Sequence, residues 1–262
     1  MSTNGHNLRI PDAELAAIPR PVVALAADYD SGYHITPHTH IHAQLIHGSE
    51  GILQVRAGAG SWVVPPDRGL WVPAGIEHEI VMRGRVAMRT LYIEPDVLPD
   101  MPAHCAVVAV GPLLQALIQR AVSAPPVYDE RGPDGRIFAV ILDELRLLPT
   151  IPLHLPLGHD RRLQRVTVAL DRSPGDGRPL EAWAREAGAS PRTLARLFLR
   201  ETGMTFGAWR QQARLLHALI GLAEGRPVTS LALDLGYASP SAFIQAFKRA
   251  FGTTPSRYFR EA

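Results

Sequence analysis

A short stretch near the N-terminus, PHTHIHAQLIHGSEG (residues 37–51), holds four of the eleven histidines of the chain: His38, His40, His42 and His47. Clustered imidazoles are common ligands of zinc, nickel, copper and iron, so this stretch indicates a metal site. Such sites are often catalytic. The rest of the sequence has to decide between catalysis and another use of the same side chains.

If the stretch is a β-strand, the sequence positions of these residues assign them to one or the other face of the sheet. Residues two apart on a strand point to the same face of the sheet. His38, His40 and Gln44 then share one face, and His42 shares it as well and competes as a ligand. His47 lies on the opposite face, where we expect it at the surface or in side-chain packing.

Length and composition restrict the class of protein. The 262 residues are enough for two domains, and 46% hydrophobic and 20% charged residues are typical of a folded chain. No segment approaches the roughly 18 apolar residues of a membrane span, and the N-terminus lacks a signal-peptide pattern. Cys105 is the only cysteine, which excludes an internal disulfide and a cysteine-rich zinc site. We therefore expect a cytoplasmic protein.

The net charge of +2 conceals an asymmetry along the chain. Residues 1–158 hold 11 Arg and no Lys against 16 acidic residues, a net charge of −5. Residues 159–262 hold 15 Arg and one Lys against 9 acidic residues, a net charge of +7. This asymmetry is typical of a sensing or enzymatic domain joined to a nucleic-acid-binding domain. A domain that is merely rich in Arg is the alternative.

The first part of the chain predicts a β-rich domain followed by helices. Residues 21–95 consist of short apolar segments interrupted by Gly and Pro, which indicates an antiparallel sandwich or small barrel. Residues 111–122 and 133–148 carry apolar residues at helical spacing. The second helix has a broad apolar stripe that can cover the barrel and also meet a second copy of the chain. We expect a homodimer through residues 111–148; a helix packed wholly inside its own domain is the alternative. The stripe comprises Ile137, Phe138, Ile141, Leu142, Leu145 and Leu148.

The two parts of the chain are joined by a segment rich in proline. Residues 149–158, PTIPLHLPLG, contain three prolines and predict an interdomain linker. The chain beyond the linker has helical patterns throughout. The predicted organisation is a leader at 1–20, a β-rich domain with the dimerisation helices at 21–148, the linker at 149–158, and an all-α domain at 159–262.

The all-α domain contains an internal repeat. Residues 180–206 match residues 228–255 at an offset of 48, which becomes 49 after one extra residue in the second turn. Each copy predicts a helix-turn-helix, in which Gly ends a short helix and Ser190 or Ser239 caps the next helix, with Pro at its first position. Residues 206–224 join the copies as a helix of roughly 28 Å. Such a spacing suits two successive major grooves about 34 Å apart.

The second helix of each copy has one face for the core and one for contact. Leu194 with Phe198, and Phe243 with Phe247, are four residues apart and are predicted to face the core. Arg and Gln suit bidentate contacts with guanine and adenine, and Lys suits phosphate. Two helical hairpins packed for structural reasons alone are the alternative. The predicted DNA-binding residues are Arg192, Thr193, Arg196, Ser241, Gln245 and Lys248.

The tandem arrangement resembles the AraC/XylS family of bacterial transcription regulators. The resemblance covers about the last 100 residues, and its most specific motif is the closing segment GYASPSAFIQAFKRAFGTTPSRYF. It implies a regulator that binds promoter DNA, with the first copy reading one groove and the second copy the next. Ser241 and Ala242 are short, which implies fewer base contacts from the second copy.

Members of this family often carry an N-terminal cupin barrel that binds an effector, and the strand-rich part resembles one. The cupin pattern has His-x-His, a later Glu and a Gly, to which His38, His40, Gln44 and Gly51 are similar. PAGIEH, which ends at His78, is similar to the second cupin motif. The resemblance implies that the three histidines and Gln44 face the barrel interior and hold a divalent metal such as Zn, Ni, Cu or Fe.

Gln44 stands where the cupin pattern has Glu, so the site lacks a negative charge that helps to hold a cation. The alternative to a metal site is a polar lining that contacts an organic effector, with His42, Arg89 and Tyr92 as further pocket candidates. Two other functions remain open: a metal-dependent cupin enzyme of dioxygenase or isomerase type with a helical appendage, and a sensor of the metal itself. The duplicated basic helix-turn-helix favours a regulator, because an enzyme does not need it.

Overall fold

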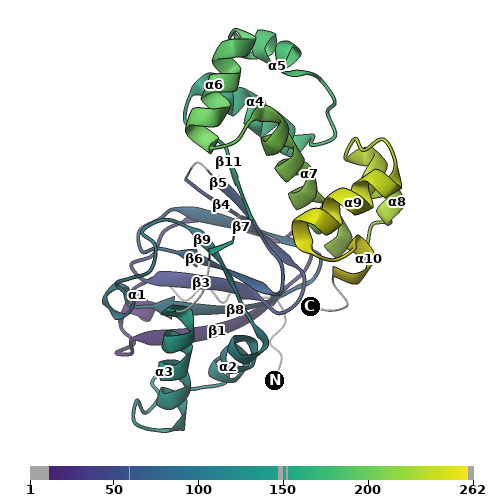
Figure 1. Ribbon diagram of the computed structural model, residues 1–262. Coiled ribbons are helices and arrows are strands. Elements are labelled where there is room, and N and C mark those ends of the chain that lie inside the picture. The colour runs from purple at the N-terminus through teal and green to yellow at the C-terminus, as the bar shows by residue number, and fades with distance from the viewer. Residues whose placement is uncertain (1–11, 59, 147–149, 152, 259–262) are drawn as a thin grey trace. The chain divides into compact units, whose positions relative to one another are not determined.

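The computed structural model describes residues 12–58, 60–146, 150–151 and 153–258. The chain divides into two compact units, one made of residues 1–58 and 64–153 and the other of residues 59–63 and 154–262. The first is built from strands with two long helices, and the second is mostly helical (Figure 1).

The strands form two antiparallel sheets, so the prediction of an antiparallel β-rich domain is confirmed. A six-stranded sheet has the order β1-β8-β3-β6-β9-β10, and a five-stranded sheet has the order β11-β5-β4-β7-β2. The strands are β1 (Val22–Tyr29), β2 (His34–His38), β3 (Ala43–Gly48), β4 (Ile52–Ala57), β5 (Gly60–Val64), β6 (Arg68–Val72), β7 (His78–Arg83), β8 (Val86–Ile93), β9 (Ala106–Ala109), β10 (Thr150–Ile151) and β11 (His154–Pro156).

The burial of each strand follows from what covers its faces. Side chains of β7 alternate between buried and half-buried positions, as expected where one face meets the core. Every residue of β3 is buried, so this strand is covered on both faces. Gly51 turns the chain from β3 to β4 with a positive φ of 71°, and a Cβ there would lie 2.3 Å from the carbonyl oxygen of Arg85. Only glycine fits that turn.

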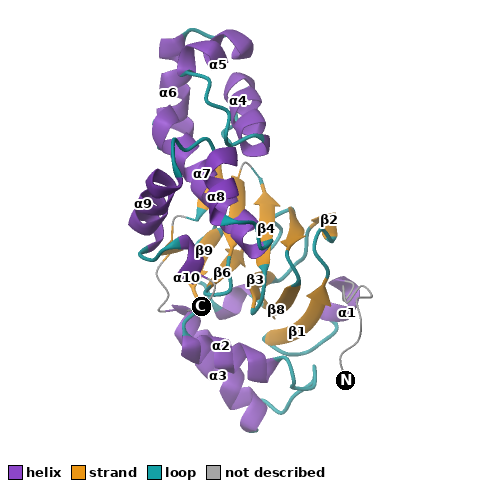
Figure 2. Cartoon of the chain, turned by 90° about the vertical axis from the view of Figure 1, so that its right-hand side faces the viewer, coloured by secondary structure: helices purple, strands orange, loops and turns teal. Residues whose placement is uncertain are grey.

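Two helices, α2 (Pro112–Ala121) and α3 (Pro133–Arg146), lie side by side next to β8 and β1 (Figure 2). Phe138, Ile141 and Leu145 of α3 are at most 3% exposed and belong to one core cluster with residues of the six-stranded sheet. Most of the predicted apolar stripe is therefore buried in the core of the first unit. Leu148 lies outside the described residues.

A few apolar side chains of these helices remain at the surface. Leu113 of α2 is 57% exposed and Val140 of α3 is 42% exposed. Arg120, near the end of α2, forms an ion pair with Asp134 in the first turn of α3. Leu113 and Val140, which do not belong to the predicted stripe, are thus the large apolar side chains that the described parts of these helices leave exposed.

The predicted linker contains two short strands. β10 pairs with β9, and β11 pairs with β5, each at the edge of its sheet. Edge positions tolerate proline because its missing N–H need not bond to a neighbouring strand. The predicted leader likewise contains a short helix, α1 (Asp12–Ala16), in which Leu15 is buried. A 3-10 turn, η1 (Pro95–Val97), follows β8.

The described residues of the second unit include seven helices, and five of them match the two helix-turn-helix copies and the joining helix that the repeat predicted. Trp183, Phe198, Trp209, Phe243 and Phe247 are its largest fully buried side chains. None of the described helices is long and apolar enough to cross a membrane. The helices are α4 (Arg161–Arg172), α5 (Leu180–Ala187), α6 (Pro191–Thr202), α7 (Phe206–Ala223), α8 (Val228–Asp234), α9 (Pro240–Phe251) and α10 (Pro255–Tyr258).

Candidate functional site

Three histidines of the first unit come together, although His38, His40 and Gln44 do not share one strand as predicted. β2 ends at His38, His40 lies in the connection that follows, and Gln44 belongs to β3. β2 pairs with β7, where His38 lies opposite His78, whereas β3 lies in the other sheet. The single-strand interpretation is therefore wrong. The side chains converge because the chain crosses from one sheet to the other between His38 and Gln44.

The three imidazoles form a compact group. The ring centroids of His38 and His78 are 4.3 Å apart, and those of His40 and His78 are 5.0 Å apart. One potential ligand atom from each of the three residues lies within 4.8 Å of the others. His40 and His78 are buried and His38 is half-buried.

Backbone carbonyls fix the tautomer of each ring. The Nδ1 atoms of His38 and His78 each lie 2.9 Å from a carbonyl oxygen, of Thr36 and Ile76, and that of His40 lies 2.5 Å from the carbonyl oxygen of His42. A carbonyl oxygen can only accept a hydrogen bond, so each Nδ1 carries the proton. In a neutral imidazole Nε2 then carries the lone pair that binds a metal.

Gln44 presents another acceptor to these nitrogens. Its Nε2 donates to Thr90 Oγ1 at 2.8 Å, and Thr90 Oγ1 donates to the carbonyl oxygen of Leu45 at 3.0 Å, so the orientation of the amide is fixed. Gln44 Oε1 therefore faces the imidazoles, 3.0 Å from His40 Nε2 and 3.2 Å from His78 Nε2.

Gln44 Oε1 and the Nε2 atoms of neutral His40 and His78 are all hydrogen-bond acceptors. Two imidazolium ions with centroids 5.0 Å apart in a buried site would repel each other and lose hydration. A divalent cation satisfies the nitrogen lone pairs and the amide oxygen at once. The donor set of three imidazoles and one carbonyl oxygen thus fits zinc, nickel, copper or iron.

A cavity of about 280 Å³ adjoins the histidines. The rings of Tyr29 and Tyr33 lie 4.8 Å apart, and Tyr92 meets His40 edge to face at 5.3 Å. No Lys, Arg, Asp or Glu is found among the described residues that line it. The lining residues are Tyr29, Tyr33, His34, Ile35, Thr36, His38, Gln44, Ile80, Met88 and Tyr92.

The other predicted pocket residues lie elsewhere, apart from Tyr92. Arg89 lines a second cavity of about 330 Å³ next to α2, and its Nη1 donates to Asp28 at 2.9 Å. His42 is buried but does not line the cavity beside the histidines. His47 is only 1% exposed, so the expectation of a surface residue is wrong and that of a packing residue fits. It lines the cavity of Arg89, and burial lowers its pKa.

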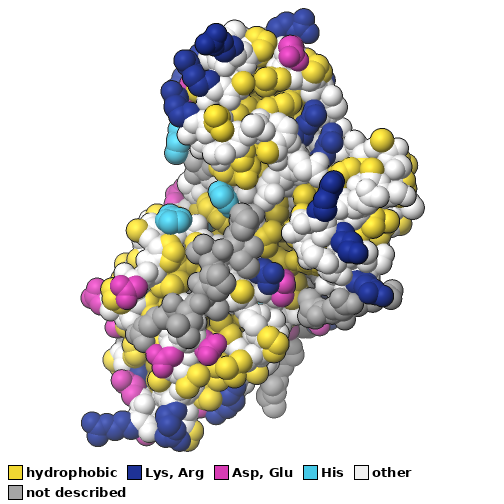
Figure 3. Space-filling view, viewed as in Figure 1, with side chains coloured by type: hydrophobic (Ala, Val, Ile, Leu, Met, Phe, Trp, Pro, Cys, Tyr) yellow, Lys and Arg dark blue, Asp and Glu magenta, His cyan; other side chains and the backbone are white. Residues whose placement is uncertain are grey.

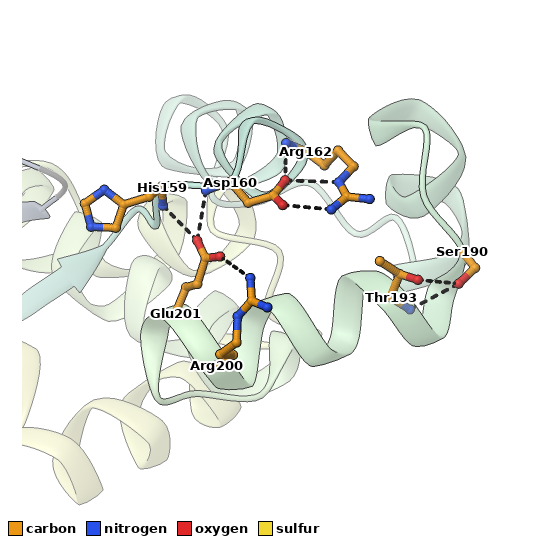
Figure 4. Close-up of polar contacts among 7 residues, drawn as sticks. All are labelled: His159, Asp160, Arg162, Ser190, Thr193, Arg200 and Glu201. Carbon is orange, nitrogen blue, oxygen red and sulfur yellow. Dashed lines mark hydrogen bonds and ion pairs between the residues drawn. The ribbon is translucent and has the colours of Figure 1, made fainter.

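In the second unit, the start of α6 is fixed by a serine cap. Ser190 Oγ accepts from the Thr193 backbone N–H at 3.1 Å and lies 2.9 Å from the Thr193 hydroxyl (Figure 4). Thr193 is therefore half-buried and engaged within the helix, whereas Arg192 and Arg196 are exposed. Figure 3 shows Lys and Arg side chains gathered over α6.

The end of α6 is held against the start of α4. Glu201 Oε2 accepts from the backbone N–H groups of His159 and Asp160 at 2.8 and 2.9 Å, and Oε1 accepts from Arg200 at 2.8 Å (Figure 4). The bonds from Asp160, Arg200 and His159, in that order, lower the pKa of Glu201. Glu201 therefore satisfies free N–H groups at the N-terminus of α4 and orients α6.

The second recognition helix repeats this design. Ser239 Oγ accepts from the Ala242 backbone N–H at 3.2 Å and caps α9. The caps and core residues predicted for both copies are confirmed, since Leu194, Phe198, Phe243 and Phe247 are all fully buried. Ser241, Gln245 and Lys248 are exposed on α9. The sequence did not single out Ala195 and Leu199, which are exposed on α6 beside the arginines.

Comparisons with known proteins agree with both halves of this description. The AraC-like ligand binding domain family matches residues 20–145, and a helix-turn-helix domain family matches residues 183–261. The HTH-type transcriptional regulator NimR of Escherichia coli K12 is 34% identical over 221 residues, which are 84% of this chain and 81% of NimR. The regulatory protein SoxS of the same organism is 33% identical over 103 residues, 39% of this chain and 96% of SoxS.

A crystal structure of ToxT from Vibrio cholerae, bound to an unsaturated fatty acid, aligns with 90% of this chain and 94% of its own at 12% identity and a TM-score of 0.38. That score is too low to support a conclusion. The relatives at higher identity are transcription regulators and not enzymes. The chain belongs to the AraC family of transcription regulators, with a ligand-binding domain followed by a helix-turn-helix DNA-binding domain.

Proposed function

We propose that this regulator reads promoter DNA through the exposed faces of α6 and α9, under the control of an effector bound beside the three histidines. The supporting observation is that both helices are capped and buried on one side while Arg192, Arg196, Gln245 and Lys248 are exposed on the other. Arg192 and Arg196 read bases in one groove, Ser241 and Gln245 in the next, and Lys248 contacts phosphate. Thr193 positions the start of α6 with Ser190.

The substitution Arg196→Ala tests this docking. It removes an exposed guanidinium without touching the core, so the fold is retained while operator affinity falls by about 1–3 kcal/mol and preference relaxes at one or two base pairs. Operator affinity and a single-base substitution panel, read by fluorescence anisotropy at fixed salt, measure both effects. Arg85→Ala, at an exposed arginine in the turn between β7 and β8, is the matched control. An Arg196→Ala protein with unchanged affinity and base preference contradicts the docking.

We also propose that His38, His40, His78 and Gln44 hold a divalent cation. The support is the convergence of three imidazoles and an amide oxygen whose other atoms are fixed by carbonyls and Thr90. Such a cation supplies a positive centre for effector binding, since the family assignment gives no reason for catalysis.

Zinc titration of untagged protein tests the cation site. The wild type is expected to bind one equivalent, and His40→Ala to weaken binding at least tenfold through the loss of one ligand. His104→Ala, at an exposed histidine outside the group, is the control and keeps wild-type affinity. A wild type that binds no zinc, nickel or copper, or a His40→Ala protein that binds as tightly, contradicts the site. DNA binding that responds to the metal alone identifies the metal as the effector.

We also propose how the chain divides into domains and how it assembles. Residues 21–148 form the effector-binding and dimerisation domain, 149–158 the linker and 159–262 the DNA-binding domain. The protein acts as a homodimer through α2 and α3, supported by the exposed Leu113 and Val140. Its promoter target places it in the cytoplasm.

A further inference from the structure

We propose that the effector is a small aromatic carboxylate. Its negative charge replaces the charge of the Glu that the cupin pattern has at the position of Gln44. This inference rests on the effector and cation sites proposed above. It concerns the class of molecule that the cavity selects.

The groups around the cation are all neutral. His38, His40 and His78 have their Nδ1 protons directed at backbone carbonyls, so each offers Nε2 as an uncharged ligand. Gln44 offers an amide oxygen that is held by Thr90. A divalent cation among them keeps its full double charge in a mostly buried place, which is unfavourable until an anion joins it.

The nearby acidic side chains are engaged elsewhere. Glu79 Oε2 lies 2.8 Å from His34 Nε2 and its Oε1 lies 3.6 Å from Arg56 Nη1, while Asp28 Oδ1 lies 2.9 Å from Arg89 Nη1. Burial raises the pKa of Tyr29, which keeps that phenol neutral at ordinary pH. Among the described residues that line the cavity, none brings a carboxylate to the site. The compensating charge therefore has to arrive with the ligand.

The cavity is shaped for a short molecule with a ring. Its volume of about 280 Å³ lies just below the range of roughly 300–1,000 Å³ typical of drug-sized ligands. His38 and Gln44 line it together with three tyrosines and the apolar Ile35, Ile80 and Met88. Tyrosine rings favour offset or edge-to-face contact with another aromatic ring. A carboxylate directed at the histidines leaves the ring among these side chains.

A neutral ligand of the same shape fills the cavity but leaves the cation uncompensated. An anion without the cation, in turn, meets no Lys or Arg among the described residues of the lining, and His34 is already paired with Glu79. Cation and carboxylate therefore bind cooperatively, and each raises the affinity of the site for the other by the same factor.

Calorimetric titration of the untagged full-length protein with benzoate and benzamide tests the inference, since the two differ in charge but hardly in shape. With zinc bound, benzoate is expected to bind at least tenfold tighter than benzamide. After EDTA treatment benzoate binding is lost. Cyclohexanecarboxylate is expected to bind several-fold more weakly than benzoate, because it lacks the aromatic contacts.

Equal binding of benzoate and benzamide, or benzoate binding that survives removal of zinc, overturns the charge inference. Equal binding of benzoate and cyclohexanecarboxylate overturns the aromatic part. If zinc binds but its affinity does not change with benzoate, the cation site is supported and only the inference about the carboxylate is contradicted. If the protein does not bind zinc, the proposed cation site is contradicted together with the carboxylate inference. The zinc titration therefore distinguishes a failure of the cation site from a failure of the carboxylate inference alone.

Gln44→Glu provides an independent test within the protein. The carboxylate restores the missing charge, so zinc binds at least tenfold tighter and benzoate at least tenfold more weakly. Gln44→Asn keeps the site neutral, although its shorter side chain reaches less far, and is expected to retain the preference of benzoate over benzamide. A Gln44→Glu protein that keeps wild-type affinity for both zinc and benzoate overturns the role assigned to Gln44.

Discussion

Single side chains in this protein act mainly by fixing the orientation of their neighbours. Carbonyl oxygens fix the three imidazoles, Thr90 fixes the amide of Gln44, and Glu201 holds the two residues that precede α4. The sequence identified the histidines and Gln44 through their spacing. It did not identify Tyr29 and Tyr33, because no motif marks residues that reach a cavity only through the pairing of distant strands.

Glu201 gives a pH-dependent prediction at this scale. Its pKa is lowered in the folded protein, so it stabilises the fold above the ordinary carboxyl pKa and loses that contribution as pH falls through the lowered value. Glu201→Gln keeps an acceptor but removes the charge near the helix N-terminus, which costs about 0.3–1 kcal/mol at neutral pH.

Thermal unfolding of both proteins between neutral and acidic pH measures this difference. The melting temperature of the wild type is expected to exceed that of Glu201→Gln at pH 7, and the two values are expected to converge at low pH. Glu50→Gln, at an exposed glutamate in the turn between β3 and β4, is the control. A gap that stays constant or widens with falling pH contradicts the prediction.

At the scale of elements, the helical domain was the more predictable part. Helix caps, terminal glycines and i, i+4 core pairs act within a few residues, so the sequence reveals them directly. The histidine-bearing segment was harder, because His40 lies between two strands that belong to different sheets. The apolar stripe of α3 predicted that one side of the helix is buried. The sequence could not tell whether a second copy or the same unit covers this side, and the structure shows that the first unit covers most of the stripe.

The repeated serine caps give a prediction for the recognition helices. Ser239→Ala leaves the Ala242 N–H at the start of α9 without its capping oxygen and destabilises the domain by about 1 kcal/mol. Operator affinity falls modestly, since α9 begins less rigidly. Urea unfolding and operator binding measure the two effects, and Ser239→Asp, which restores an acceptor, recovers the stability. An unchanged midpoint for Ser239→Ala contradicts the capping role.

At the scale of the whole molecule, the proposed homodimer depends on the surface that α2 and α3 leave exposed. Most of the predicted stripe is buried within the first unit, so a dimer has to use what remains exposed on α2 and α3, above all Leu113 and Val140. The opposite charges of the two parts of the chain, −5 and +7, fit a division between sensing and DNA binding.

Val140→Asp tests this assembly. A charge in an apolar interface is costly to bury, so the variant is expected to be monomeric at concentrations where the wild type is dimeric. Light scattering after size-exclusion chromatography measures the mass. Val168→Asp, at a valine of α4 that is 36% exposed, leaves the dimer intact. A monomeric wild type, or a dimeric Val140→Asp protein, contradicts the proposed interface.

The unbroken helix α7 has a consequence for the promoter. Its 18 residues span about 27 Å and join the two helix-turn-helix units without an internal break. If both helix-turn-helix units dock as proposed, their two half-sites on the DNA keep a fixed rotational phase. Each base pair inserted between them turns one half-site by about 35° away from its helix, since a turn of DNA holds roughly 10 base pairs. The length of α7 is therefore expected to limit the spacing of the half-sites.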